Sequence, residues 1–357
     1  MERVYNFSAG PSMLPLEVLE QAREEILNFR GSGQSVMEMS HRSPVFQEIF
    51  DSTKEKLKTV LSVPDSHEIL FLQGGATLQF AAIPMNLMAS GRADYAVTGN
   101  FSGKAAKEAE KYGEVAIAFS SAPEHARIPA QSELKLTDGA DYFYYCANNT
   151  IYGTEWQYVP ETKAPLVCDM SSDILSRPVD VARYGLIYAG AQKNMAPAGL
   201  TVVIIDKSLA GKEKPYTPQI MSYRTLIETD SMLNTPPCWC IYMLGLTLDW
   251  VIAQGGLDAM EEMKTERAGR LYDFLDGSSF YLPHAEKESR SDMNVTFRTA
   301  SAELDAAFVK GAAERGLVNI KGHKIAGGMR ASLYNGMPLE GVDALIAYMK
   351  DFEREHV

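Results

Sequence analysis

Two hydrophobic patterns alternate along the first two thirds of the chain. Apolar residues recur at helical spacing over residues 16–28 and 45–61, which predicts amphipathic helices there. Short apolar segments predict strands, namely "HEILFL", "DYAVTG", "EVAIAFS", "DYFYYC", "APLVCD", "YGLIYA" and "LTVVII". The last four are continuously apolar, which is typical of strands buried on both faces of a parallel sheet. The sequence therefore predicts an α/β fold in which helices cover both sides of a mostly parallel sheet.

The pattern changes after Gly255. A long amphipathic helix is predicted over residues 257–276, and shorter helices over 302–315 and 341–353. They alternate with the strand-like segments "NVTFRT" and "IAGGMRASLYN". We therefore expect a large α/β domain over residues 16–254, and a small α+β domain formed by residues 255–357 together with the N-terminal segment 1–15.

Composition excludes several classes of partner. The formal net charge of −12 makes nucleic acid and anionic membranes poor partners, so an anionic substrate needs a local cluster of cations. No apolar run is long enough to span a membrane, and the first residues lack the pattern of a signal peptide. The four cysteines form no CxxC pair, so we expect reduced thiols, no metal site and a cytoplasmic protein.

A candidate phosphate site lies in "QGGATLQF". Two glycines end a predicted strand and begin a predicted helix, whose first amides belong to Ala76 and Thr77. Bare amides and the helix dipole at such an end bind phosphate, although the same letters also fit a plain turn. The chain contains neither GxGxxG nor GxxxxGK[ST], so the dinucleotide and P-loop classes lack their fingerprints.

Two charged residues follow predicted core strands. Asp169 ends the strand in "VCDMSSD", where it could keep a heterocyclic nitrogen protonated or simply cap a helix. Lys193 lies in "GAQKNMAPAGL", between two predicted core strands. A partly desolvated lysine there becomes a nucleophilic amine, whereas a solvated one would merely extend out of a loop. Together with the phosphate site, the two residues form the set that holds pyridoxal phosphate.

Eight segments resemble the phosphoserine aminotransferase family, in the fold-type I group of pyridoxal phosphate enzymes. They are "YNFSAGPSMLP", "MEMSHRSPVF", "FLQGGAT", "ANNTIYGTE", "CDMSSDILSRP", "YAGAQKNMAPAGL", "NTPPCW" and "KGHKIAGGMRASLYNGMPLEGV". The resemblance runs almost end to end and implies a seven-stranded-type sheet and a homodimer with shared active sites. It also implies reversible transfer of the amino group of O-phospho-L-serine to 2-oxoglutarate, giving 3-phosphohydroxypyruvate and L-glutamate. A second candidate substrate is the 4-phosphohydroxy-L-threonine of vitamin B6 synthesis.

The resemblance also assigns the cofactor site. Lys193 would form the Schiff base and transfer the proton, and Asp169 would pair with the pyridinium nitrogen. The remaining cofactor contacts would be Ala76, Thr77, Phe101, Thr150 and Gln192, with Asn234 and Thr235 reaching the cofactor phosphate of the other subunit. Phe101 stands where the family commonly has a tryptophan, and a phenyl ring can stack but has no indole N–H.

Five residues are expected at the substrate. Arg42, with His41, would bind the distal anion, and His323 and Lys324 would lie near the substrate phosphate. Arg330 would bind the α-carboxylate through two parallel hydrogen bonds. Alone, "SHRS" also fits a surface loop, and the arginine also fits a structural ion pair. The family often has arginine in place of Lys324, and lysine keeps the charge but loses the planar fork.

Rival functions remain open at this point. Another fold-type I transaminase, for example one for glyoxylate, would keep the same lysine chemistry. A cysteine desulfurase would need a reactive thiol on a mobile loop, and Cys238 and Cys240 are the loop-like candidates. A non-catalytic binding protein that keeps only the scaffold is the third alternative, and the intact Lys193 and Asp169 argue against it.

Overall fold

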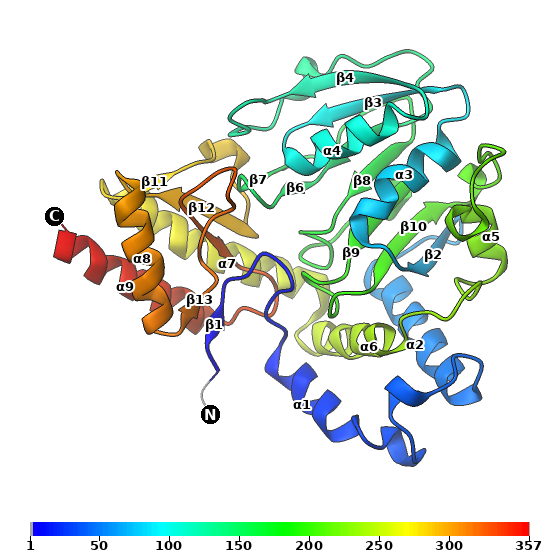
Figure 1. The fold of residues 1–357 in the computed structure, drawn as a ribbon, viewed down its shortest axis with the longest axis horizontal. Coiled ribbons are helices and arrows are strands. Elements are labelled where there is room, and N and C mark those ends of the chain that lie inside the picture. The colour runs from blue at the N-terminus through cyan, green and yellow to red at the C-terminus, as the bar shows by residue number, and fades with distance from the viewer. Residues whose placement is uncertain (1–2, 357) are drawn as a thin grey trace.

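The computed structural model describes residues 3–356 and centres on a seven-stranded sheet of order β2-β10-β9-β8-β5-β3-β4 (Figure 1). Its strands are β2 (His67–Leu72), β3 (Arg92–Val97), β4 (Glu114–Ser120), β5 (Phe143–Cys146), β8 (Leu166–Asp169), β9 (Leu186–Gly190) and β10 (Thr201–Asp206). Only β10 runs antiparallel to its two neighbours, and the other strand pairs are parallel. The predicted mostly parallel sheet is therefore confirmed.

Helices cover both faces of this sheet. They are α1 (Leu16–Glu25), α2 (Pro44–Val60), α3 (Gly75–Leu87), α4 (Asn100–Ala109), α5 (Tyr223–Glu228) and α6 (Cys238–Ala253). Successive residues of β8 enter different hydrophobic cores: Leu166 and Cys168 pack on the side of α2 and α6, and Val167 on the side of α3 and α4 (Figure 1). Burial on both faces explains why the strand sequences are apolar without alternation.

The C-terminal part has its own core. It contains α7 (Gly256–Gly277), α8 (Ala302–Glu314), α9 (Leu339–His356) and an antiparallel sheet of β11 (Leu282–Pro283), β12 (Asn294–Arg298) and β14 (Met329–Ser332). Strand β1 (Tyr5–Asn6) pairs with β13 (Leu317–Val318), so the N-terminal segment lies against this part (Figure 1). The position of the domain boundary stays a prediction.

Two local details differ from the sequence-based expectations. The helix predicted over residues 16–28 ends at Glu25, and the chain then turns, with Arg30 in the left-handed region at φ 46°. Cys238 and Cys240 lie in the first turn of α6 rather than on a loop. Within residues 3–356 no single helix is long and apolar enough to cross a membrane, and only α6 and α7 together, bent by 83°, reach that length and composition.

Candidate active site

Lys193 lies in the connection that follows β9, and two hydroxyl groups hold its amine. Nζ donates hydrogen bonds to Thr150 Oγ1 at 2.8 Å and to Ser172 Oγ at 2.7 Å. The two hydroxyl oxygens are themselves 2.6 Å apart. No carboxylate among the described residues forms an ion pair with Lys193. Two neutral hydroxyl groups therefore hold the amine in place, which suits the predicted role of Lys193 as a nucleophile.

Hydrogen bonds from two other segments hold the backbone around Lys193 in place. The amide of Ala191 donates to the carbonyl of Leu200 at 3.0 Å, which closes the connection between antiparallel β9 and β10. Ser12 approaches from the N-terminal segment, where its amide donates to Gln192 O at 2.9 Å and its hydroxyl donates to Lys193 O. The N-terminal segment therefore packs directly on the backbone of Lys193.

Asp169 is the last residue of β8 and is 4% exposed. One carboxylate oxygen accepts the amide of Ser171 at 2.9 Å, and the other accepts the hydroxyl of Tyr188 at 3.0 Å. Burial, with Asp169 close by, raises the pKa of Tyr188 well above its usual value, so this phenol stays neutral and donates. A buried carboxylate without a cationic partner among residues 3–356 can accept a hydrogen bond from a protonated ring nitrogen.

The helix start predicted to bind phosphate is present. Gly74 and Gly75 take φ values of 92° and 66°, which turn the chain sharply from β2 into α3. No side chain caps this helix, so the amides of Ala76 and Thr77 have no partner within it. Free amides at the positive end of a helix dipole are the donors that a phosphate needs.

Phe101 lies in the first turn of α4, facing the lysine. Its ring centroid is 5.9 Å from Lys193 Nζ and 5.7 Å from Nζ of Lys104. The phenyl ring therefore lies beside the reactive amine, where a planar cofactor ring could stack on it. Lys104 was missed in the sequence, although its position three residues after Phe101 on one helix face was a usable signal.

Arg330 on β14 reaches the same pocket from the C-terminal part. Its guanidinium donates to the carbonyl of Thr150 at 3.4 Å, and its Nε is buried without a hydrogen-bond partner. Burial lowers its pKa, and no ion pair joins it to a described carboxylate. The alternative of a structural ion pair is thus not supported within residues 3–356. An unpaired, half-buried arginine beside the reactive lysine is well placed to bind an anionic ligand.

Cations gather next to Arg330. The pKa of His323 is lowered by burial and then by the positive charges of Arg330, Lys324 and Lys104. These four residues, here called the cationic cluster, come from α4, from the segment that leads into β14 and from β14 itself. Arg330, Lys324 and Lys104 supply the local positive charge that an anionic substrate needs on a chain of net charge −12, and His323 adds a group that can take up a proton.

Four other predicted site residues make no hydrogen bond or ion pair with Lys193 among the described residues. Arg42 is exposed in the turn before α2, beside His41, and no hydrogen bond or ion pair of the described residues links either to the pocket. Asn234 and Thr235 are exposed before α6, where the Asn234 amide donates to Gln73 Oε1 at 3.0 Å. Their roles stay predictions.

The chemistry of the pocket fits pyridoxal phosphate. It offers an amine, a buried carboxylate, an uncapped helix start, an aromatic ring and an arginine with an orphaned Nε. The two cysteines considered for a desulfurase do not fit, because burial raises the pKa of Cys238 and of Cys240, and both lie in a helix. Fold and pocket together define a fold-type I enzyme that depends on pyridoxal phosphate.

Comparison with known proteins agrees with this class. Residues 4–345 match the model of the aminotransferase class-V family. A phosphoserine aminotransferase from Geobacillus kaustophilus is 50% identical over 99% of both chains, and one from Bacillus cereus is 50% identical over 100% of both. The chain therefore belongs to the aminotransferase class-V family and, within it, to the phosphoserine aminotransferases.

Solved structures agree at the level of the whole chain. The phosphoserine aminotransferase from Bacillus circulans subsp. alkalophilus is 43% identical and superposes with a TM-score of 0.98, covering 100% of both chains. The pyridoxal phosphate-bound enzyme from Trichomonas vaginalis is 41% identical, with a TM-score of 0.94 over 98% of this chain and 100% of that one. The chain is thus an aminotransferase with pyridoxal phosphate as its cofactor and small molecules as its substrates.

Proposed function

We propose that this aminotransferase converts O-phospho-L-serine and 2-oxoglutarate reversibly into 3-phosphohydroxypyruvate and L-glutamate, in serine biosynthesis and in the cytoplasm. The names of the relatives support this reaction. The observation that carries it is the cationic cluster beside Lys193, whose Arg330 lacks an acidic partner among the described residues. A substrate with a carboxylate at one end and a second anion at the other matches these donors.

Each residue of the pocket would have a defined task. Pyridoxal phosphate, when bound, accepts the electron pair left when the Cα–H bond of the substrate breaks. Lys193 Nζ would take that proton from Cα and would return it on the cofactor side of the substrate nitrogen. Asp169 holds a proton on the ring nitrogen, and the hydroxyls of Thr150 and Ser172 aim the amine. The same groups then serve the reverse transfer from glutamate.

The two ends of the substrate would bind to different residues. Arg330 binds the α-carboxylate, which every amino-acid substrate carries. The distal phosphate meets His323 and Lys324, together with Lys104, which the structure adds to the predicted set. A phosphate dianion gains more from several cations than a carboxylate does, because it carries nearly two charges and three acceptor oxygens.

The active form would be a homodimer. Arg42 and Asn234 are exposed on the single chain, as expected of residues that complete the site of another subunit. In this arrangement Asn234 and Thr235 reach the cofactor phosphate of the partner, and His41 and Arg42 bind the distal anion of the substrate.

A half-reaction panel tests the proposed substrate. The holoenzyme is mixed with single amino acids, and the loss of the cofactor's visible absorbance is followed in time. Phosphoserine and glutamate should discharge it rapidly, whereas alanine, aspartate and cysteine should react slowly. Including 4-phosphohydroxythreonine measures the second candidate substrate. Rapid reaction with alanine but not with phosphoserine would instead indicate another transaminase of the same fold.

A further inference from the structure

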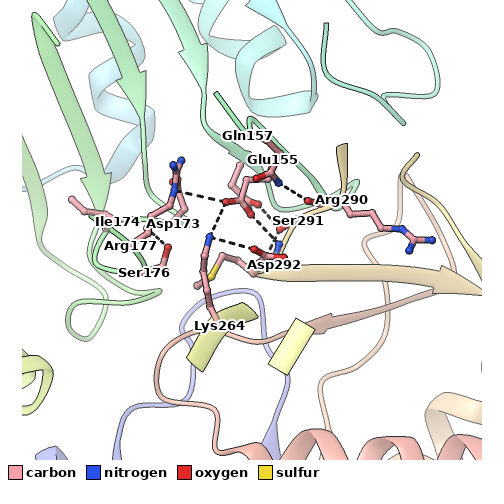
Figure 2. Close-up of polar contacts among 12 residues, drawn as sticks. Glu155, Gln157, Asp173, Ile174, Ser176, Arg177, Lys264, Arg290, Ser291 and Asp292 are labelled. Atoms are coloured by element: carbon pink, nitrogen blue, oxygen red, sulfur yellow. Dashed lines mark hydrogen bonds and ion pairs between the residues drawn. The ribbon is translucent and has the colours of Figure 1, made fainter. Parts of the chain in front are cut away.

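A buried ion cluster lies where the end of β7 and the turn after β8 meet α7 and the segment before β12 (Figure 2). It consists of Glu155, Asp173, Arg177, Lys264 and Asp292, and is called the buried ion cluster below. Lys264 Nζ lies 3.3 Å from Glu155 Oε1 and 3.4 Å from Asp292 Oδ2. Arg177 lies 3.4 Å from Asp173 Oδ2 and 4.0 Å from Glu155 Oε1.

The cluster joins elements that are far apart in sequence. Glu155 ends the short strand β7 (Thr154–Glu155), and Lys264 comes from the middle of α7. Asp292 precedes β12, and its amide donates to Glu155 Oε2 at 2.9 Å. Figure 2 shows Lys264 pointing toward both Glu155 and Asp292. The cluster therefore fixes the C-terminal part against the segments that border the pocket.

Both hydroxyls that hold Lys193 lie on segments anchored by this cluster. Thr150 lies in the turn between β6 (Asn148–Asn149) and β7, and β7 ends at Glu155. Ser172 immediately precedes Asp173 in the turn that follows β8. Glu155 and Asp173 are the most deeply buried carboxylates of the cluster, with 0% and 1% of their side chains exposed.

Charge makes this anchoring sensitive to single substitutions. A buried carboxylate is tolerated only with a partner, and removing one member of a buried pair leaves the other charge uncompensated. Lys264 is 3% exposed and is the nearer of the two cations to Glu155. Burial, opposed by Arg177, raises the pKa of Asp173 to about 6, so this carboxylate depends on its surroundings for its charge.

We propose that Glu155, Asp173 and Lys264 are positioning residues, which set the direction of the Lys193 amine by fixing the segments that carry Thr150 and Ser172. None of the three touches the lysine itself. The inference rests on the proposed role of Lys193 as the residue that carries the cofactor. A displacement of reacting groups by about 1 Å can cost two orders of magnitude in rate, which gives such positioning a measurable effect.

The test compares purified holoenzymes of the wild type and of Lys264→Met. The first readout is the pH midpoint at which the visible absorbance of the cofactor changes, and the second is kcat with KM for glutamate. We expect the midpoint to shift by at least about 0.5 pH unit. We also expect kcat to fall about tenfold to a hundredfold and KM to rise by less, because the amine is displaced directly, whereas the substrate site is affected only through the Thr150 carbonyl that Arg330 contacts at 3.4 Å.

Two matched variants separate positioning from general stability. Lys264→Arg keeps the charge and should restore most of the wild-type midpoint. Lys54→Met removes another half-buried lysine, which pairs with Glu68 at 2.7 Å and Asp230 at 2.6 Å near the opposite end of β2 from the phosphate site. It should lower the unfolding temperature without moving the midpoint. An unchanged midpoint and kcat in Lys264→Met would overturn the proposal.

A second variant keeps the test decisive if Lys264→Met does not fold. Asp173→Asn preserves volume and removes one charge next to Ser172, so the same two readouts apply, and an unchanged midpoint and kcat would again overturn the proposal.

Borohydride reduction and peptide mapping of the wild type separately check the premise that Lys193 carries the cofactor. If the cofactor is trapped on a lysine other than Lys193, the proposed site is wrong. Trapping on Lys193 with no effect of the variants refutes only the positioning.

Discussion

Ionisable side chains around the pocket differ in how many hydrogen bonds they make. Asp169 is buried yet accepts two hydrogen bonds, from a backbone amide and from the hydroxyl of Tyr188. Lys193 donates only to hydroxyl groups. Arg330 donates to one backbone carbonyl, and its Nε has no hydrogen-bond partner. The carboxylate of Asp169 thus already accepts two hydrogen bonds, whereas Arg330 has a donor that is free to bind a ligand. This difference is what a site should show when its ligands bring negative charge.

Proton uptake at His323 follows from this arrangement. Burial and the charges of Arg330, Lys324 and Lys104 lower its pKa, so the free enzyme holds the imidazole neutral at pH 7.5. A bound phosphate favours the charged form, so its pKa rises on binding and up to about one proton is taken up. Affinity should therefore increase as the pH falls from 7.5 toward 6.

Calorimetry of the holoenzyme can count these protons. The ligand is 3-phosphoglycerate, which has both anions but no reactive amine, titrated in buffers of different ionisation enthalpy. His323→Gln should bind with less proton uptake than the wild type. The phosphate's own titration is common to both proteins and cancels in the difference. Equal proton uptake in both would show that His323 does not meet the phosphate.

At the scale of elements, the glycine turn before α3 shapes the predicted phosphate site. A Cβ on Gly74 would lie 2.5 Å from Leu78 Cδ2, and its φ of 92° disfavours any side chain. Gly74→Ala should therefore displace the free amides of α3 and weaken cofactor binding by at least about tenfold, or about 1.4 kcal/mol. Gly33→Ala is the control, because its φ of 77° is similar but nothing lies within 4 Å. Equilibrium dialysis measures the cofactor affinity of both.

Sequence patterns predicted these elements because the signals are local. Continuous apolar strands, the Gly74–Gly75 turn and Lys193 after β9 each depend on neighbours in the chain. The contact of Arg330 with Thr150 depends instead on how β14 meets the turn between β6 and β7, and no local spacing encodes that meeting. The resemblance to a family supplied the residues of the site, and their contacts could come only from the folded chain.

At the scale of the whole molecule, the proposed homodimer with shared active sites predicts complementation between two inactive subunits. Asn234→Asp places a negative charge near the cofactor phosphate of the partner and weakens cofactor retention. Lys193→Ala removes the reactive amine. A hybrid dimer of these variants has one intact site, with Lys193 from one subunit and Asn234 from the other, so mixing should recover part of the activity. No recovery, with subunit exchange verified by mass spectrometry, would count against sharing.

The central claim is that the cationic cluster selects a substrate with a distal phosphate, and the most direct measurement is kcat/KM for phosphoserine against serine. Serine leaves these cations unpaired in a partly desolvated site and loses binding energy that could be used at the reacting atoms. Wild-type enzyme should prefer phosphoserine by at least about a thousandfold, or roughly 4 kcal/mol. Arg42→Ala, which removes the contact with the distal anion that the proposed dimer adds to this cluster, should reduce this preference while leaving the cofactor absorbance unchanged. Comparable kcat/KM values for serine and phosphoserine in the wild type would contradict the account.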